Sequence, residues 1–236
     1  MYKNYIFDLY GTLVDINTDE GSREFWYKLS LFFSFKGATY DPQELQDLYE
    51  NLIKAEKQKI KDTNYQDFPI EIVFKKLYQN KDISASDQLI TDTAHFFRIN
   101  SIKYLKLYDG ARELLELLKA KGKKIYLLSN AQKVFTLYEM KALDIEKYFD
   151  DIFISSDYNV CKPDSKFFNA LIQKHNLNIN ESIMIGNDYM CDINGAVDAG
   201  LDSLYIDSNL SPKIIGKLNS KYSVSYIFEA AKLIVK

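Results

Sequence analysis

The spacing of apolar residues changes twice along this chain. Residues 3–9 form a short apolar run that stops at an aspartate, which is typical of a buried strand ending in a turn. From about residue 16 to residue 106, apolar side chains recur at the interval of amphipathic helices. After residue 107, short apolar runs alternate with helix-type segments. The pattern therefore predicts a helical block inserted between one strand and a strand–helix repeat.

The inserted block is expected to contain about four helices. Asp41 is suited to cap one of them, and Pro42 to occupy its first turn. The four predicted segments are 23–33, 41–60, 70–79 and 85–102. The aromatic-rich stretch 25–35 either forms the core of this block or faces a binding site.

The second part of the chain alternates between strands and helices. Strands are predicted at 123–130, 150–156, 182–188 and 202–207. Helices are predicted at 109–122, 133–143, 164–176, 191–200 and 225–235. Such alternation indicates a parallel sheet with helices on both faces. We therefore expect an α/β fold with a Rossmann-like parallel-sheet core, built from residues 1–15 and 107–236, and an inserted all-helical domain at 16–106.

Polar side chains follow several of the predicted strands. These side chains are Asp8, Ser129 with Asn130, and Asn187 with Asp188. Lys162 lies in a loop before a predicted helix. Ligands of open parallel sheets bind beyond the carboxyl ends of the strands, so these groups are expected to converge there. Carboxylates suit a hard cation and a lysine suits an oxyanion, which together predict a site for a phosphate and a divalent metal.

Four segments carry a resemblance to a known family. "DLYGT", "LLSN", "KPD" and "IGNDYMCDINGAVDAG" resemble, in order, the four motifs of the haloacid dehalogenase-like (HAD) hydrolase superfamily. The helical insert after the first motif is similar to the helical (C1) cap of that family. The resemblance covers the whole chain.

The resemblance implies a role for each matching residue. Asp8 would be the nucleophile that forms a covalent aspartyl intermediate, Ser129 would hold the transferred group, and Lys162 would neutralise both. The implied catalytic set is Asp8, Tyr10, Ser129 and Lys162. The implied phosphate-binding set is Gly11, Thr12, Ser129, Asn130 and Lys162. The implied ligands of a Mg²⁺ ion are Asp8, the Tyr10 carbonyl, Asp188, Asn187 and Asp192, with Asp188 preferred for direct contact.

Each of these side chains also has a structural interpretation. Asp8 could cap a turn and Ser129 could be a plain turn residue. Lys162 could be a solvated surface lysine. Asp192 could be the first-turn acid of the following helix, where negative charge is favoured.

Tyr10 separates two possible activities. Most phosphatases of this resemblance have an aspartate there that protonates the leaving group, and a phenol with a pKa near 10 is a poor substitute at neutral pH. The "DxYGT" pattern also resembles the start of metal-independent 2-haloacid dehalogenases, which use a cap arginine; the insert contains Arg23 and Arg98. Asp188 beside Asp8 favours a metal-dependent phosphatase, because two carboxylates without a cation would raise a pKa. A third possibility is a protein that binds phosphorylated ligands without turnover.

Composition narrows the class of partner. The 236 residues carry a net charge of −3, without the basic footprint of a nucleic-acid binder. Cys161 and Cys191 do not form a disulfide framework, and no apolar stretch approaches the roughly 20 residues that span a bilayer. We therefore expect a cytoplasmic enzyme, monomeric or homodimeric, that acts on a small phosphorylated molecule and binds neither nucleic acid nor membrane.

Overall fold

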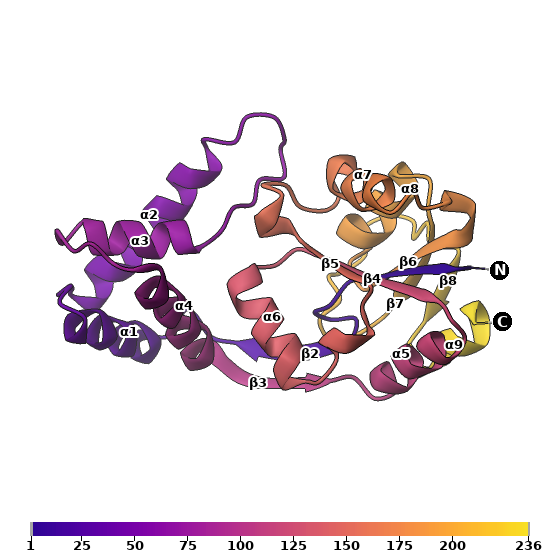
Figure 1. Cartoon of the computed structure of the whole chain (residues 1–236), viewed down its shortest axis with the longest axis horizontal. Helices are drawn as coiled ribbons and strands as arrows, with labels where there is room; N and C mark the ends of the chain where they lie inside the picture. Colours follow the sequence, from indigo (N-terminus) through magenta and orange to yellow (C-terminus); the bar gives the residue numbers. More distant parts are fainter. Residues whose placement is uncertain (1, 236) are drawn as a thin grey trace.

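The computed structural model describes residues 2–235, and its centre is a parallel sheet of six strands (Figure 1). The strands lie in the order β5-β4-β1-β6-β7-β8. Their bounds are Asn4–Phe7 (β1), Lys124–Ser129 (β4), Asp151–Ile154 (β5), Ser182–Gly186 (β6), Asp202–Ile206 (β7) and Tyr222–Val224 (β8). Every neighbouring pair is parallel, which confirms the predicted α/β class. The central position of β1 places the residue that follows it, Asp8, at the middle of the sheet's carboxyl edge.

Helices cover both faces of the sheet (Figure 1). Their bounds are Ala111–Ala120 (α5), Lys133–Ala142 (α6), Ser165–Lys174 (α7), Gly195–Asp198 (α8) and Ile227–Ile234 (α9). Successive side chains of a strand point to opposite faces. In β1, Tyr5 and Phe7 accordingly join the apolar core under α5 and α9, whereas Ile6 joins the core under α7 and α8. Burial on both faces explains why the strands read as apolar runs.

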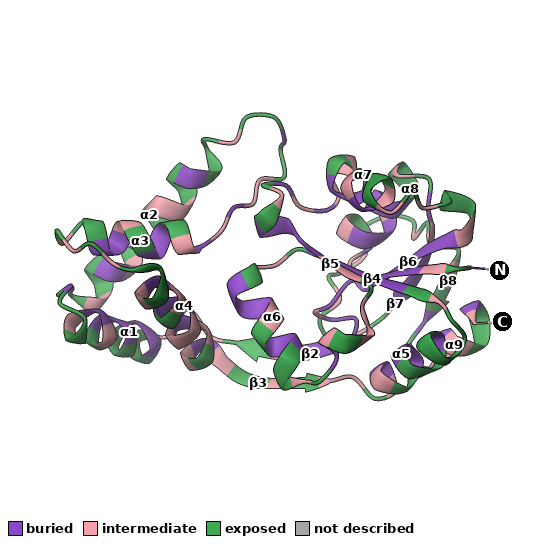
Figure 2. Cartoon of the chain, viewed as in Figure 1, coloured by how far each residue is buried: buried purple, intermediate pink, exposed green. Residues whose placement is uncertain are grey.

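A second group of helices forms the cap. These helices are Arg23–Phe35 (α1), Pro42–Lys57 (α2), Glu71–Gln79 (α3) and Asp87–Ser101 (α4). Asp41 caps α2 as predicted, accepting hydrogen bonds from the first backbone N–H groups. Buried and exposed residues alternate around these helices (Figure 2). Phe25 and Phe33 of α1 lie in the cap's own core, so the aromatic segment 25–35 supports the cap fold.

The cap core continues onto the sheet domain. Phe97 of α4 stacks on Phe135 of α6, with ring centroids 6.1 Å apart. The apolar cluster of the cap therefore includes one face of α6. The division of the chain into residues 16–106 and the remainder stays a prediction, because this packing continues across it.

The connections between cap and core correct the all-helical prediction for residues 16–106. Val14–Thr18 (β2) pairs antiparallel with Ile102–Leu107 (β3). The two segments that connect the core to the cap therefore form one two-stranded ribbon. The last four residues of β3, 104–107, alternate in exposure, which is a strand period that the preceding helical pattern obscured. Strand β8 was also missed, because three residues give almost no periodic signal.

No helix within residues 2–235 combines the length and apolar character needed to cross a membrane.

Candidate active site

The loop after β1 presents Asp8 to the carboxyl edge of the sheet. The backbone N–H of Asp8 donates to the carbonyl of Ile185 in β6, at 2.9 Å. The chain then turns sharply, and the Leu9 carbonyl accepts three N–H groups from the following residues. Asp8 is thus fixed by a neighbouring strand on one side and by a tight turn on the other.

Gly11 allows this turn to lie against the loop after β6. Its φ of +83° belongs to the left-handed region that favours glycine. A Cβ at this position would also lie 2.3 Å from the amide nitrogen of Asn187. The two loops that carry the candidate site can therefore meet only over a glycine.

The Asp8 carboxylate receives hydrogen bonds from three other predicted site residues. Its Oδ1 accepts from Lys162 Nζ at 2.7 Å and, at a longer 3.5 Å, from Ser129 Oγ. Its Oδ2 accepts from Thr12 Oγ1 at 3.2 Å, and that hydroxyl also lies 3.3 Å from Asn187 Oδ1. The structure therefore brings the predicted nucleophile, hydroxyl and lysine together.

Lys162 is a buried ammonium between two carboxylates. Its side chain is 1% exposed and lies 2.7 Å from both Asp8 Oδ1 and Asp192 Oδ1. Burial alone would lower the pKa of Lys162, but the carboxylates of Asp192 and Asp8 hold that pKa above its ordinary value. Lys162 is therefore a charged site residue, and the surface-lysine interpretation is wrong.

Asp192 is buried behind the lysine. Its Oδ2 accepts the backbone N–H of Asp188 at 2.9 Å, so both of its oxygens already have protein donors. Burial raises the pKa of Asp192, an effect that Lys162 opposes and Asp8 reinforces. Two carboxylates thus share one ammonium in this interior, and any net negative charge there is costly unless another cation balances it.

Asp188 ends the loop after β6 and caps the turn that follows. Its Oδ1 accepts the N–H groups of Met190 and Cys191 at 2.8 and 2.9 Å. The predicted helix at 191–200 is wrong in detail: a wider π-type turn at Tyr189–Asn194 precedes the short α8. This turn lets Asp192 reach back under the strand, where a Cβ on Gly186 would lie 2.2 Å from its Oδ2.

Asn130 and the Gly11–Thr12 turn have structural tasks. The Asn130 side chain donates to the Lys162 carbonyl at 3.0 Å and accepts the Lys162 N–H at 2.8 Å. The N–H of Gly11 donates to Val14, and that of Thr12 to Leu9. These two N–H donors are used to form the turn, and the assignment of Gly11 and Thr12 to phosphate binding stays a prediction.

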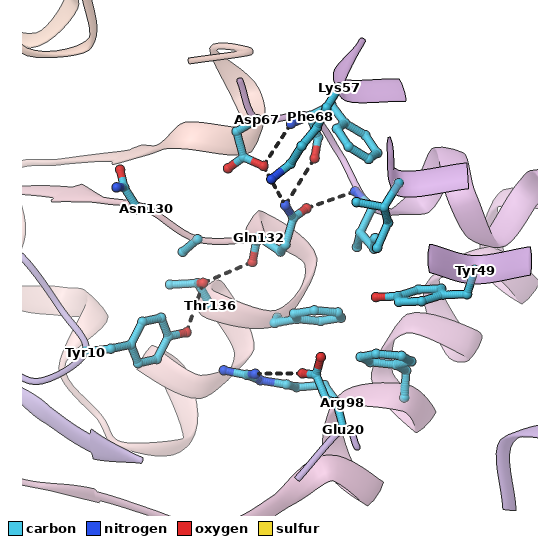
Figure 3. A pocket seen from close by; sticks show the side chains of 15 residues that line it. Tyr10, Glu20, Tyr49, Lys57, Asp67, Phe68, Arg98, Asn130, Gln132 and Thr136 are labelled. Atoms are coloured by element: carbon cyan, nitrogen blue, oxygen red, sulfur yellow. Dashed lines mark hydrogen bonds and ion pairs between the residues drawn. The ribbon is translucent and has the colours of Figure 1, made fainter. Parts of the chain in front are cut away.

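Two adjacent cavities open above these residues. The first, about 180 Å³, is lined by Asp8, Tyr10, Asn130, Lys162, Asn187, Asp188, Cys191, Asp192, Leu210 and Pro212. The second, about 370 Å³, lies between cap and core (Figure 3). Tyr10 and Asn130 line both. The arrangement offers a small polar chamber at Asp8 and a larger chamber beside it.

The Tyr10 side chain belongs to the larger cavity (Figure 3). Its hydroxyl donates to Glu139 of α6 and lies 3.1 Å from Thr136 Oγ1. Burial and the Glu139 charge raise the pKa of Tyr10 above its ordinary value. The phenol is therefore held as a structural donor rather than as a group that exchanges protons.

Arg98, which the sequence offered only as a possible substrate-binding arginine, pairs with a carboxylate beside Tyr10. Arg98 of cap helix α4 places its Nε 2.5 Å from Glu139 Oε1 and its Nη1 3.8 Å from Glu20 Oε1. The sequence feature that could have indicated this pair is Glu139, which lies on the buried face of α6. A buried carboxylate is rare unless it is paired, so Glu139 requires a partner such as an arginine.

The donor set fits a cation of the Mg²⁺ type. Among residues 2–235, acidic, histidine and cysteine side chains do not gather in a group of three that could hold a metal. A site here would therefore depend on Asp8 and Asp188, completed by a main-chain carbonyl, an amide oxygen and water. Mg²⁺ commonly binds in this way, with one or two carboxylates and several waters.

A parallel sheet, a helical cap and a lysine-bound strand-end aspartate define a class of capped α/β hydrolases. The model of the haloacid dehalogenase-like hydrolase family matches residues 2–200. This chain belongs to that family.

Curated relatives are distant. A glyceraldehyde 3-phosphate phosphatase from Pyrococcus abyssi is 24% identical over 132 residues, covering 56% of each chain. A pyrimidine 5'-nucleotidase from Streptococcus pneumoniae is 24% identical over 207 residues, covering 86% of this chain and 83% of the relative. The first two relatives are matched over only about half of their length, 56% and 47%.

Solved structures show the same fold over the whole chain. A 2-haloacid dehalogenase from Pseudomonas syringae superposes with a TM-score of 0.71 at 16% identity, covering 99% of this chain and 98% of that one. The magnesium-bound HAD-hydrolase YfnB from Bacillus subtilis gives a TM-score of 0.59 at 18% identity, covering 100% and 99%. Because a dehalogenase and a magnesium-bound HAD-hydrolase both share this fold, the activity has to be argued from the site.

Proposed function

We propose that this protein is a Mg²⁺-dependent phosphatase that transfers the phosphoryl group of a small metabolite to Asp8. The observation that carries the proposal is the pair of buried carboxylates, Asp8 and Asp192, facing the single ammonium of Lys162, with Asp188 lining the same cavity. A divalent cation held by Asp8 and Asp188 would offset the excess negative charge. A metal-free dehalogenase has no such need for a further carboxylate in the cavity of its nucleophile.

The residues divide the work of binding and attack. An ammonium has three donors, and Lys162 uses two of them on Asp8 and Asp192, which leaves one for a phosphoryl oxygen. Ser129 lies beside the same carboxylate and supplies a hydroxyl donor. Asp8 attacks phosphorus, the bond to the leaving oxygen breaks, and water then hydrolyses the aspartyl phosphate.

The metal would be held by Asp8, the Tyr10 main-chain carbonyl, and Asp188 with the amide oxygen of Asn187. When bound, Mg²⁺ supplies positive charge to the transferring phosphoryl oxygens. Asp192 serves as a positioning residue for Lys162, because its two oxygens are bonded to Lys162 and to the Asp188 N–H.

The alternatives are weaker. A dehalogenase of this resemblance needs a cap arginine for the substrate carboxylate, but Arg98 is bound to Glu139, and Arg23 lies on the outer side of α1 in a different cavity. A protein that binds phosphorylated ligands without turnover would not require the Asp8–Lys162–Asp192 arrangement.

The relatives named as phosphatase and nucleotidase act on small phosphorylated molecules, which supports a small-molecule substrate. The helical C1 cap, the cytoplasmic location and a monomer or homodimer remain part of the proposal.

A substrate panel tests the proposal. Aryl and acyl phosphates and 2-haloacids are each incubated with and without Mg²⁺, using the native protein and Asp8→Asn. Phosphate release that needs both Mg²⁺ and Asp8 supports the phosphatase. Halide release without metal would instead establish the dehalogenase, and binding without any product would establish the ligand-binding alternative.

A further inference from the structure

The larger cavity between cap and core has a charge pattern that limits the leaving group. Its lining includes two cations, Lys57 and Arg98, and two carboxylates, Glu20 and Asp67. Glu139 adds a third carboxylate directly behind Arg98. The cavity therefore has no excess positive charge to offer a ligand.

Arg98 is the cation that faces the chamber nearest Tyr10 (Figure 3). Its Nε is 2.5 Å from Glu139 Oε1, and its Nη1 is 3.8 Å from Glu20 Oε1. Its guanidinium carbon lies 5.7 Å from the Tyr10 ring centroid and 5.3 Å from that of Phe135. Carboxylates thus occupy its edges and aromatic rings flank its faces, so the guanidinium is already neutralised by the protein.

The polar groups on the opposite wall are also engaged. Gln132 donates to Asp67 at 3.0 Å and to the Phe68 carbonyl at 3.1 Å, and accepts from the Ile70 N–H at 2.8 Å. Lys57 lies close enough to Asp67 to lower the carboxyl pKa, although burial of that carboxyl has the larger, opposite effect. The remaining surface of the cavity is mostly apolar and includes the aromatic rings of Tyr49, Phe68, Phe97 and Phe135.

We infer that the leaving group of the substrate is uncharged and carries a ring, without a carboxylate or a second phosphate. This inference rests on the proposed function, because it places the leaving group in the larger cavity next to Asp8. An anion there would face Glu20 and Asp67. The two lining cations are already opposed by carboxylates, Arg98 by Glu139 and Glu20, and Lys57 at longer range by Asp67, so the like-charge contacts would dominate. A neutral ring matches the aromatic walls and the Tyr49 hydroxyl, which points into the cavity (Figure 3).

Two matched aryl phosphates test the inference. One is para-(carboxymethyl)phenyl phosphate, and the other is its methyl ester, which has nearly the same shape without the charge. The methylene separates the carboxyl group from the ring, so the two phenol leaving groups have similar pKa values. The native enzyme with Mg²⁺ is expected to hydrolyse the ester with a kcat/KM at least about tenfold higher. Equal rates, or a preference for the carboxylate, would overturn the inference while leaving the phosphatase proposal intact.

A charge-removing variant makes the test specific to Arg98. Glu20→Gln removes one carboxylate from the guanidinium and should raise the acid-to-ester ratio of kcat/KM about fivefold. Glu113→Gln, at an exposed position of α5 outside the cavity, is the control and should leave the ratio unchanged. A ratio that is the same in Glu20→Gln and native protein would show that Arg98 pairing does not set the preference.

A binding measurement separates this inference from the proposed function. Dissociation constants of the two compounds are measured by calorimetry with the Asp8→Asn protein and Mg²⁺, where no turnover is needed. Tighter binding of the ester supports the inference even if the native protein releases no phosphate. Tighter or equal binding of the acid, or no binding of either compound, would refute it.

Discussion

The hydroxyl of Tyr10 donates its hydrogen bond to Glu139, a carboxylate that also binds Arg98 of the cap. Tyr10 follows the candidate nucleophile by two residues, yet its side chain joins the interface between cap and core. The proton carrier expected at this position in most related phosphatases is therefore replaced by a structural contact.

Tyr10→Phe should change kcat/KM by less than about threefold, because the phenol transfers no proton in the proposed reaction. The variant should still lose about 1–2 kcal/mol of stability, since Glu139 loses a buried donor. Steady-state kinetics and urea unfolding measure the two effects separately. A loss of activity far larger than the loss of stability would give the phenol a chemical role after all.

The native enzyme should depend steeply on leaving-group pKa. Charge develops on the leaving oxygen in a loose transition state, and nothing at position 10 protonates it. A series of aryl phosphates, measured where chemistry limits the rate, gives the slope. Tyr10→Asp should improve alkyl phosphates by about 10²-fold relative to acyl phosphates if the new carboxyl reaches the leaving oxygen. A flat series in the native protein would contradict this explanation.

Gly11→Ala should abolish activity, whereas Gly122→Ala should not. Both glycines have positive φ, at +83° and +65°, so both substitutions carry the left-handed backbone cost of about 1–2 kcal/mol. Only at Gly11 does a Cβ meet Asn187; at Gly122 nothing lies within 4 Å. The two variants are compared in kcat/KM after their unfolding free energies are shown to be similar. A difference in activity then reports the contact between the two site loops rather than a loss of stability. Equal activity of the two variants would mean that this contact is dispensable.

Asp192→Asn should alter the pH dependence of stability. The folded-state pKa of Asp192 is raised by burial, so the folded chain holds its proton more tightly than the unfolded chain. That contribution to stability is complete below the unfolded pKa, near 3.9, and is lost as pH rises through the higher folded value. The stability of native protein relative to Asp192→Asn should therefore fall with rising pH in metal-free buffer. Denaturant unfolding at a series of pH values measures it, and a difference that grows with pH would contradict the assignment.

Asp188→Ala should eliminate the stabilisation by Mg²⁺. The proposed ion binds the folded protein alone, so saturating Mg²⁺ should raise Tm in the native protein. Asp198→Ala, at an exposed position of α8, is a matched control and should keep the full shift. Thermal melts with and without Mg²⁺ measure this Tm shift in each protein. A Tm shift that survives in Asp188→Ala would place the ion elsewhere.

The parallel sheet and the four cap helices could be predicted because their apolar spacing is strong and local. Asp8 and Ser129 could be placed together because they lie at the carboxyl ends of parallel strands, which share one edge of the sheet, and Lys162 could be placed with them because its loop precedes a helix on the same edge. The ribbon of β2 and β3 could not be predicted, because its pairing joins residues that are far apart in sequence and its side chains are partly exposed.

The direction of the Tyr10 side chain also lay beyond the sequence. Whether a tyrosine faces the nucleophile or the cap depends on its partners, and Glu139 and Thr136 come from a helix more than a hundred residues away. The same holds for Arg98, whose type suggested substrate recognition until its pairing with Glu139 was visible.

The β2–β3 ribbon joins the cap to the core at a single place. The N–H of Asp19 donates to the carbonyl of Ser101 at 2.8 Å, so the insert leaves and re-enters the core at almost one point. A different insert with equally close ends can be joined there without stretching the sheet domain or moving Asp8. Such an insert would still have to supply partners for Phe135 and Glu139 of α6, which now contact Phe97 and Arg98 of the cap.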